Sequence, residues 1–177
     1  QENAREGVAP NAAHRFVADL ERAGKLSAVV TQNIDGLHQR AGSERVLELH
    51  GNWSRLTCTG CGEHITLDDV DDARSGKVPH CPACASVLRP DIVFYGEMLD
   101  SDVIEGAVRA ISEADLLIVA GTSLVVYPAA GLIDYYAGER LVLMNATPTP
   151  YDSRADLIIR EPVGQVFEEL GRWSRRP

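Results

Sequence analysis

The four cysteines of the chain stand in two identical pairs, and their spacing is the strongest chemical signal in the sequence. Two residues separate the members of each pair, and nineteen residues separate the pairs. A Cys-x-x-Cys turn lets both thiolates point at one ion, and two such turns complete a tetrahedron around zinc. Because four protein ligands leave no open position on the metal, we expect one structural zinc ion. The predicted ligands are Cys58, Cys61, Cys81 and Cys84.

Two other interpretations of the cysteines were weighed. A pair of disulfides suits a small secreted chain rich in cysteine, and a chain of 177 residues with four cysteines is neither. A redox-active Cys-x-x-Cys is the second alternative. The zinc interpretation is favoured because it uses all four cysteines together.

Three continuous apolar runs end in residues that could hold a ligand. The runs extend from Leu26 to Val30, from Leu116 to Ala120 and from Leu141 to Met144. Loops after such strands are rich in small and polar residues for ordinary turn chemistry, so this pattern leaves a nucleotide pocket and a plain loop both open. The chain has neither a Gly-x-Gly-x-x-Gly nor a Walker sequence. The candidate residues are Gln32, Asn33, Ile34 and Asp35, then Gly121, Thr122 and Ser123, then Asn145, Ala146 and Thr147.

Two of the polar residues could also have plain structural roles. Asp35 could simply cap a short helix. His50 follows Leu47-Glu48-Leu49 and precedes Gly51-Asn52, which places it at a strand end. An imidazole there could act as a general base near neutral pH, although a histidine at a strand end is more often only a polar terminus.

The elements between these residues predict an α/β fold with a doubly wound parallel sheet. Continuous apolar strands are typical of a sheet covered by helices on both faces. Helices are expected at residues 10–23, 101–112, 128–137 and 164–173. The cysteine segment interrupts this alternation. We therefore predict a main domain formed by residues 1–55 and 88–177, with a small zinc domain at 56–87 that depends on its metal and has one weak helical stretch.

Composition narrows the function classes. Lysine and arginine number 17 against 26 acidic residues, a net charge of −9, so binding to a nucleic-acid backbone is not expected. The hydrophobic content of 45% suits a globular protein, and no run is long enough to span a bilayer. With no leader pattern at its first residue, the chain is expected in the cytoplasm with reduced thiols.

Five motifs in order resemble the sirtuin family of NAD-dependent protein deacylases. The resemblance covers most of the chain, from about residue 10 to about residue 170. It implies a Rossmann-like domain with an inserted zinc ribbon. The motifs are Gln32-Asn33-Ile34-Asp35-Gly36-Leu37-His38, Glu48-Leu49-His50-Gly51, the two cysteine pairs, Leu88-Arg89-Pro90-Asp91-Ile92-Val93-Phe94-Tyr95-Gly96-Glu97 and Gly121-Thr122-Ser123-Leu124-Val125-Val126-Tyr127-Pro128.

The resemblance also implies a role for each candidate residue. His50 matches the general base, which takes a proton from a ribose hydroxyl after nicotinamide has left. The remaining matches are Gln32 and Asn33 with ribose and water, Ile34 with the cofactor, Asp35 with nicotinamide, Gly121, Thr122 and Ser123 with adenosine and phosphates, Asn145, Ala146 and Thr147 with the adenosine ribose, Val163 with adenine, and Ile92, Val93 and Phe94 with an acetyl-lysine peptide.

The implied reaction is NAD-dependent protein-lysine deacetylation, in which the acyl group moves to ADP-ribose. Mono-ADP-ribosyl transfer and a non-catalytic zinc-containing interaction module are the alternatives. The family also has an N-terminal strand with a Gly-Ala-Gly loop that nothing here matches, so the Rossmann-like domain is expected to be N-terminally incomplete. We accordingly expect the 177-residue chain alone to bind NAD weakly and to be inactive or weakly active. The acyl preference is left open.

Overall fold

The computed structural model describes residues 8–70 and 77–173, and its core is built on parallel strands. Strand β1 (Val29–Thr31) pairs with β2 (Val46–Glu48) in parallel, in a two-stranded sheet. A second parallel sheet has the order β6-β7-β8, formed by β6 (Leu117–Ala120), β7 (Leu141–Met144) and β8 (Leu157–Ile159). Each of the three predicted apolar runs therefore contains a strand that pairs in parallel with a neighbour, β1 in one sheet and β6 and β7 in the other.

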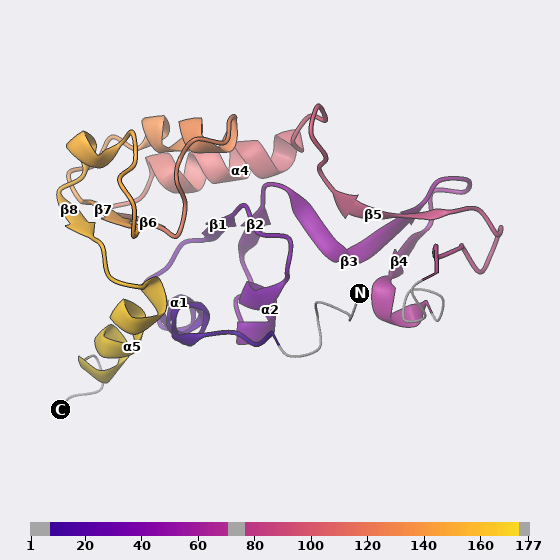
Figure 1. Ribbon diagram of the computed structural model, residues 1–177, viewed down its shortest axis with the longest axis horizontal. Coiled ribbons are helices and arrows are strands. Elements are labelled where there is room, and N and C mark those ends of the chain that lie inside the picture. Colours follow the sequence, from indigo (N-terminus) through magenta and orange to yellow (C-terminus); the bar gives the residue numbers. More distant parts are fainter. Residues whose placement is uncertain (1–7, 71–76, 174–177) are drawn as a thin grey trace.

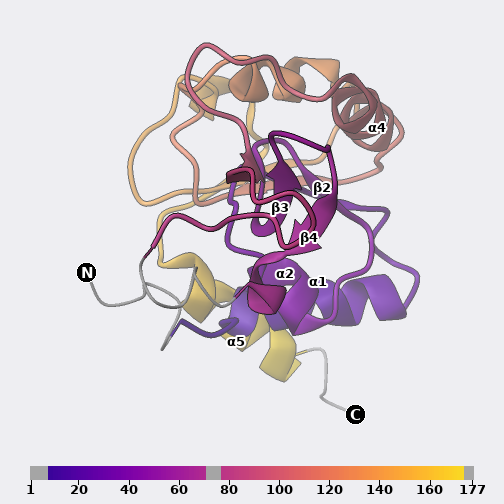
Figure 2. The ribbon, with the colours of Figure 1, turned by 90° about the vertical axis from the view of Figure 1, so that its right-hand side faces the viewer.

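Helices cover both faces of these strands. Helix α4 (Ser101–Ser112) lies on one side, whereas α1 (Ala12–Arg22), α2 (Leu37–Ala41) and α5 (Val163–Trp173) lie on the other (Figures 1 and 2). The rings of Phe16 and Phe167 join α1 to α5, with centroids 5.4 Å apart. This layering confirms the predicted α/β class with helices on both faces of parallel strands.

Side-chain caps set the starts of helices α1 and α4. The Asn11 side chain accepts hydrogen bonds from the amides of Ala13 and His14, so α1 begins at Ala12 rather than at the predicted residue 10. Asp100 caps α4 in the same way, through the amides of Asp102 and Val103. Such caps satisfy backbone donors that have no partner in the first helical turn.

Two predicted elements differ in the structure, and one strand was not predicted. The first strand starts at Val29 rather than Leu26, because pairing with β2 begins there. The helix expected at 128–137 is a 3₁₀ helix, η2 (Ala129–Tyr135), in which the Gly131 amide donates to the Pro128 carbonyl three residues back. Strand β8 was not predicted, because its apolar run is short and two of its three residues are exposed. A further 3₁₀ turn, η3 (Asp152–Arg154), precedes it.

The cysteine segment forms an antiparallel sheet of its own. Its order is β4-β3-β5, made by β3 (Gly51–Cys58), β4 (His64–Thr66) and β5 (Leu88–Ile92). The weak helical stretch is the 3₁₀ turn η1 (Leu67–Asp69), and residues 71–76 lie outside the described part. The sheet begins at Gly51 and ends at Ile92, and the division into domains at residues 56 and 87 stays a prediction.

Each lobe has a separate apolar core. The main core lies between α4, η2 and the strands β6 and β7, and Leu143 at its centre is 1% exposed. The second core lies beneath the antiparallel sheet and comprises Leu56, Cys58, Val70, Cys81 and Leu88. None of the helices in the described ranges combines the length and the apolar character that a membrane crossing requires.

Candidate functional site

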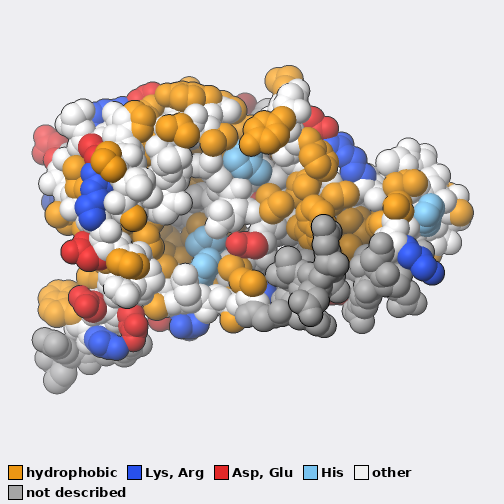
Figure 3. Space-filling model, in the orientation of Figure 1, with side chains coloured by type: hydrophobic (Ala, Val, Ile, Leu, Met, Phe, Trp, Pro, Cys, Tyr) orange, Lys and Arg blue, Asp and Glu red, His pale blue; other side chains and the backbone are white. Residues whose placement is uncertain are grey.

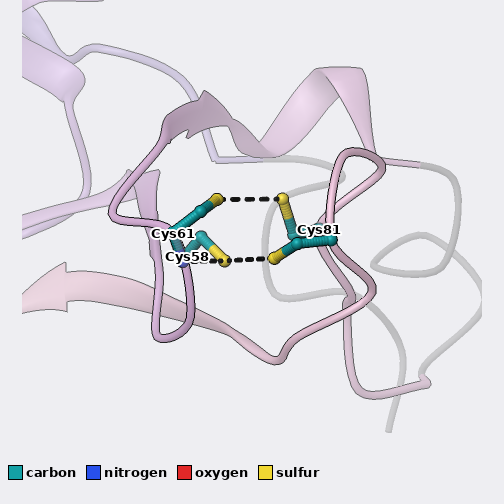
Figure 4. A group of neighbouring side chains, drawn as sticks. Cys58, Cys61 and Cys81 are labelled. Carbon is teal, nitrogen blue, oxygen red and sulfur yellow. Dashed lines mark hydrogen bonds between the residues drawn. The ribbon is translucent and has the colours of Figure 1, made fainter.

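The four cysteine sulfurs converge on one point at the end of the antiparallel sheet. All four sulfur atoms lie within 4.8 Å of one another. Those of Cys58 and Cys84 are 3.4 Å apart and those of Cys61 and Cys81 are 3.8 Å apart, so the two turns face each other (Figure 4). A tetrahedron with metal–sulfur distances of about 2.3 Å has sulfur–sulfur edges of about 3.8 Å. The observed separations therefore suit a tetrahedral zinc ion.

Backbone amides prepare these sulfurs for a metal. The amides of Gly60 and Cys61 point at the Cys58 sulfur, at 3.4 and 3.5 Å, and lower the pKa of that thiol. Hydrogen bonds from the side chain and backbone of Ser86 lower the pKa of Cys84 to about 6. Because thiolates, not thiols, bind metal, these donors favour the zinc-binding form.

The Cys61 thiol shows how closely the four sulfurs lie. The Glu63 amide lowers the pKa of Cys61, but the neighbouring sulfurs of Cys58 and Cys84 outweigh it and raise that pKa to about 12. Four sulfurs this close cannot all lose their protons unless a cation replaces them. The cluster fits a divalent ion held by Cys58, Cys61, Cys81 and Cys84, and the disulfides considered as an alternative are not formed. The ion would hold the two turns together.

The second candidate site lies where β1, β2 and β3 meet, and His50 is at its centre. His50 follows β2 and precedes β3, and its carbonyl accepts the Val93 amide at 2.9 Å. Its ring atom Nδ1 lies 2.9 Å from the Gln32 carbonyl oxygen. A carbonyl can only accept, so Nδ1 carries the proton and Nε2 keeps a free lone pair. This is the tautomer that a general base needs.

The loop after β1 carries the next predicted residues beside His50. The Asn33 amide donates to the Thr31 hydroxyl at 3.0 Å, and the Asn33 side chain is exposed. Asp35 accepts the Leu37 amide through Oδ1 at 3.0 Å, at the start of α2. Gly36, not Asp35, is the N-cap of α2, so the N-cap role considered for Asp35 is wrong, and the Leu37 amide occupies one oxygen of an exposed carboxylate.

A contact across ninety residues of sequence joins this loop to the second parallel sheet. The Gln32 amide Nε2 lies 3.4 Å from the Thr122 hydroxyl, which also accepts the Leu124 amide. Gly121 precedes it with a φ of +65° and has no heavy atom within 4 Å of where a Cβ would stand. A glycine in this conformation leaves open space for a ligand beside the backbone. Ser123 is exposed in the same loop.

The loop after β7 lies next to the loop after β6, because the two strands are parallel neighbours. The Gly121 amide donates to the Met144 carbonyl at 2.9 Å. Asn145 then folds back, and its Nδ2 donates to the carbonyl oxygen of Thr147 at 2.9 Å. Ala146 and Thr147 are exposed. The carboxyl ends of three parallel strands therefore carry the predicted residues at one edge, as expected for a ligand crevice in an α/β sheet.

The predicted peptide-binding residues adjoin His50 through β5. Ile92 pairs with Gly51 across the antiparallel sheet. Phe94 is 48% exposed, with the Arg89 guanidinium 5.1 Å from its ring centroid. Figure 3 shows hydrophobic side chains gathered on the face over β3 and β5. Val163, by contrast, begins α5, and no hydrogen bond within the described ranges links it to the other site residues.

Two residues that sequence reasoning missed support the site. Gly51 has a φ of +77°, and a Cβ there would lie 1.9 Å from the carbonyl oxygen of Asp91. Arg160 donates from Nη1 to the carbonyl oxygens of Asn145 and Thr147, both at 2.9 Å, and pairs with Asp152. The His-Gly pair hinted at Gly51, whereas nothing near Arg160 in the sequence reveals its distant partners.

Comparison with known proteins identifies the family. The Sir2 family model matches residues 1–128. The NAD-dependent protein deacetylase of Clostridium acetobutylicum is 53% identical over 161 residues, which is 91% of this chain and 65% of that protein. A protein of the same name from Clostridium perfringens is 54% identical over 91% of this chain and 66% of its own length. The chain belongs to the Sir2 family and spans about two thirds of the length of these curated relatives.

Solved structures agree with this assignment. A structure described as Sir2 with a p53 peptide and NAD⁺ has a TM-score of 0.86 and 44% identity, covering 94% of this chain and 71% of that one. Another, described as Sir2 bound to an acetylated peptide, has a TM-score of 0.87 and 43% identity, covering 96% and 73%. The sirtuin resemblance and the fold predicted from the motifs are therefore confirmed.

Proposed function

We propose that the protein carrying this chain is an NAD-dependent protein-lysine deacetylase. The observation that carries the proposal is the contact between His50 Nδ1 and the Gln32 carbonyl, at 2.9 Å. It leaves Nε2 as a proton acceptor at the edge where the loops after β1 and β6 meet. The names of the curated relatives support the same activity.

The residues at this edge suit a dinucleotide. Open space beside Gly121, the exposed Ser123 and the folded loop at Asn145 offer room, hydroxyls and amides for phosphate and ribose groups. NAD, when bound, supplies a ribose carbon that accepts the acyl oxygen as nicotinamide leaves. We assign the adenosine and phosphate side to Gly121, Thr122, Ser123, Asn145, Ala146, Thr147 and Val163, and the nicotinamide side to Gln32, Asn33, Ile34 and Asp35.

His50 acts as the base in this proposal. Its Nε2 takes the proton of a ribose hydroxyl, so that the hydroxyl oxygen can bond to the acyl carbon while the lysine amine leaves. The proton on Nδ1 stays with the Gln32 carbonyl throughout, which keeps the ring in one orientation. Asn33, with an exposed amide, is assigned to positioning the water that completes the transfer.

The acetyl-lysine protein is assigned to the segment Ile92-Val93-Phe94. A peptide strand that adds beside such a segment is held by main-chain hydrogen bonds, which tolerate many sequences. The zinc ion takes no part in the chemistry, because its four thiolate ligands close the coordination shell. We place the protein in the cytoplasm, where cysteines that bind zinc stay reduced.

The product of the reaction tests this proposal. The protein expressed from the complete gene is incubated with NAD and an acetyl-lysine peptide, and the products are identified by mass spectrometry. Deacetylated peptide, nicotinamide and O-acetyl-ADP-ribose in equal amounts are expected. Transfer of ADP-ribose to the peptide without loss of acetyl would instead favour the mono-ADP-ribosyltransferase alternative, and no NAD consumption would favour a non-catalytic role.

A further inference from the structure

Two buried polar residues flank His50 within one turn. Glu48 ends β2 and Asn52 is the second residue of β3, so each is two residues away from His50. Glu48 is 8% exposed and Asn52 is 4% exposed. The Asn52 amide Nδ2 donates a hydrogen bond to Oε1 of Glu48. This hydrogen bond joins the residues on either side of His50 and so closes the turn that carries its imidazole.

Both carboxylate oxygens of Glu48 have partners from two elements. Gln39 on α2 donates to Oε1 at 2.8 Å, and the Arg55 guanidinium on β3 lies 2.9 Å from Oε2. A buried carboxylate is costly unless its oxygens are satisfied, so this one holds its donors firmly. Asn52 is held too, because its Oδ1 accepts the Ser54 amide at 2.8 Å.

The same turn is joined along its length to the loop after β1. Three hydrogen bonds make the connection, and their lengths are 2.9, 2.9 and 3.0 Å. The pairs are Leu49 N–H with the Thr31 carbonyl, His50 Nδ1–H with the Gln32 carbonyl, and Trp53 N–H with the Ile34 carbonyl. A shift of the turn would therefore move the His50 ring away from the carbonyl that fixes its tautomer.

We propose that Glu48 and Asn52 are positioning residues for His50. This inference rests on the proposed function, because it concerns the same base. Their hydrogen bond, which we call the clamp, fixes the backbone of residues 48–52. The fixed backbone keeps Nδ1 of His50 on the Gln32 carbonyl. Neither side chain needs to contact the substrate. A network that only stabilised the fold would change the melting temperature and leave the ring tautomer as it is.

The tautomer can be read directly on the 177-residue chain. Ring ¹⁵N chemical shifts of His50, assigned with a His50→Gln variant, distinguish a protonated Nδ1 from a protonated Nε2. We expect a protonated Nδ1 in the unsubstituted chain and a mixture of both tautomers in Asn52→Ala. The exposed ion pair of Arg22 with Asp19 supplies a control, since Arg22→Gln should leave the ring shifts unchanged.

Kinetics of the protein expressed from the complete gene supply the second readout. A misplaced base slows the chemical step, so Asn52→Ala should lower kcat about tenfold and keep KM for NAD and peptide within about twofold. The double variant Glu48→Gln with Asn52→Asp reverses donor and acceptor and should restore most of kcat and the single tautomer. The single variant Asn52→Asp, which sets a second carboxylate against that of Glu48, should be worse than Asn52→Ala.

The outcomes separate this inference from the proposed function. A folded Asn52→Ala with unchanged ring shifts and unchanged kcat overturns the clamp. If Asn52→Ala does not fold, Gln39→Ala, which removes an exposed donor to Glu48, decides: a mixed tautomer supports the clamp and unchanged shifts overturn it. If Asn52→Ala shows mixed tautomers but the unsubstituted protein from the complete gene does not deacetylate the peptide, the proposed function is refuted. The positioning of His50 by Glu48 and Asn52 is then still supported.

Discussion

Gly51 lies directly after the proposed base, and its missing side chain matters twice. Its φ of +77° is unfavourable for other residues, and a Cβ would fall 1.9 Å from the Asp91 carbonyl oxygen. Only glycine lets β3 and β5 approach at this point. The same approach brings the Val93 amide onto the His50 carbonyl, at 2.9 Å.

Replacement of Gly51 by alanine should therefore be far worse than an ordinary glycine substitution. We expect Gly51→Ala to lower the free energy of unfolding by more than about 3 kcal/mol, because a clash with backbone adds to the strain. Gly24→Ala is the matched control, since Gly24 has a φ of +67° but open space around it, and should cost about 1 kcal/mol. Urea denaturation measures both, and equal losses would contradict the close approach.

Arg160 is the second residue whose structural role is not evident from its neighbours in the sequence. It ties the carbonyls of Asn145 and Thr147 and pairs with Asp152. Hydrogen bonds from Thr149, followed by the contact with Arg160, lower the pKa of Asp152, so the acid stays ionised. Arg160 therefore keeps the loop after β7 in its folded-back form.

Loss of Arg160 should weaken NAD binding in the protein expressed from the complete gene. We expect Arg160→Ala to raise KM for NAD about tenfold, because the loop must then be ordered by the ligand itself. Arg154→Ala removes a comparable pair, with Asp134 on η2, but leaves the contacts of Asn145 and Thr147 in place, and should stay within about twofold. Equal effects of the two variants in steady-state kinetics would contradict the role of Arg160.

Among the elements, the antiparallel sheet β4-β3-β5 depends most on one feature, the cysteine cluster. Among the described residues its core comprises five buried side chains, two of them cysteines that would bind the metal, with Ile65 and Leu67 partly buried against them. So small a core gains much of its stability from the bound ion. The Gly60 position shows how tightly the turns meet, because a Cβ there would lie 2.2 Å from the Ser86 hydroxyl.

Metal analysis tests this dependence. We expect one zinc per chain, loss of that zinc in Cys81→Ser, and unfolding of β3, β4 and β5 on chelation while α1 and α5 persist. Thr59→Ala, which removes an exposed hydrogen bond to the Val87 carbonyl beside the cluster, should keep the metal. Mass spectrometry under native conditions and amide hydrogen exchange measure these changes. An unchanged exchange pattern after zinc removal would contradict the structural role.

The packing of α1 against α2 introduces a pH dependence of stability. The rings of His14 and His38 lie 4.7 Å apart. Burial lowers the pKa of both, and each pKa is below the ordinary 6.5 in the folded chain. Asp35, near both rings, and Glu48, near His38, oppose this shift, whereas Arg15 adds to it at His14. Nδ1 of His38 is buried with no hydrogen-bond partner among the described residues, so a proton there would be unsatisfied.

The sign of the effect follows from these lowered pKa values. Below pH 6.5 the two imidazoles bind protons in the unfolded chain but remain neutral in the folded chain. The free energy of unfolding therefore falls as the pH drops toward the folded pKa values. The His38→Gln variant should show a shallower fall between pH 7 and pH 5 than the unsubstituted chain. His80→Gln, at an exposed position, should follow the unsubstituted curve. Parallel curves for all three proteins in urea titrations would rule out the histidine pair as the cause.

At the scale of the whole molecule, two parallel sheets place their carboxyl ends at a common edge. The Gln32–Thr122 contact joins them across ninety residues. The loops after β1, β6 and β7 therefore lie next to one another, and Figure 1 shows β1 and β2 between the strands β6, β7 and β8 on one side and the antiparallel sheet of β3, β4 and β5 on the other. The proposed activity therefore depends on these loops together and not on any single motif.

The sequence could predict those features of the arrangement that are formed by residues close together in the chain. Cys58 to Cys84 and the run Leu141 to Met144 carry their structure in adjacent residues, and both predictions were confirmed. The 3₁₀ form of η2 and the short strand β8 depend on packing that no local pattern encodes. Arg160 acts through carbonyl groups that only the fold brings near it. The roles assigned to the remaining site residues stay predictions.

Replacement of His50 tests the central claim most directly. In the protein expressed from the complete gene, with zinc content and melting temperature shown to be unchanged, His50→Ala should slow deacetylation of an acetyl-lysine peptide at least about a hundredfold, the contribution expected of a general base. The exposed His80→Ala serves as the control and should retain full activity. Deacetylation by His50→Ala at close to the unsubstituted rate would contradict the account.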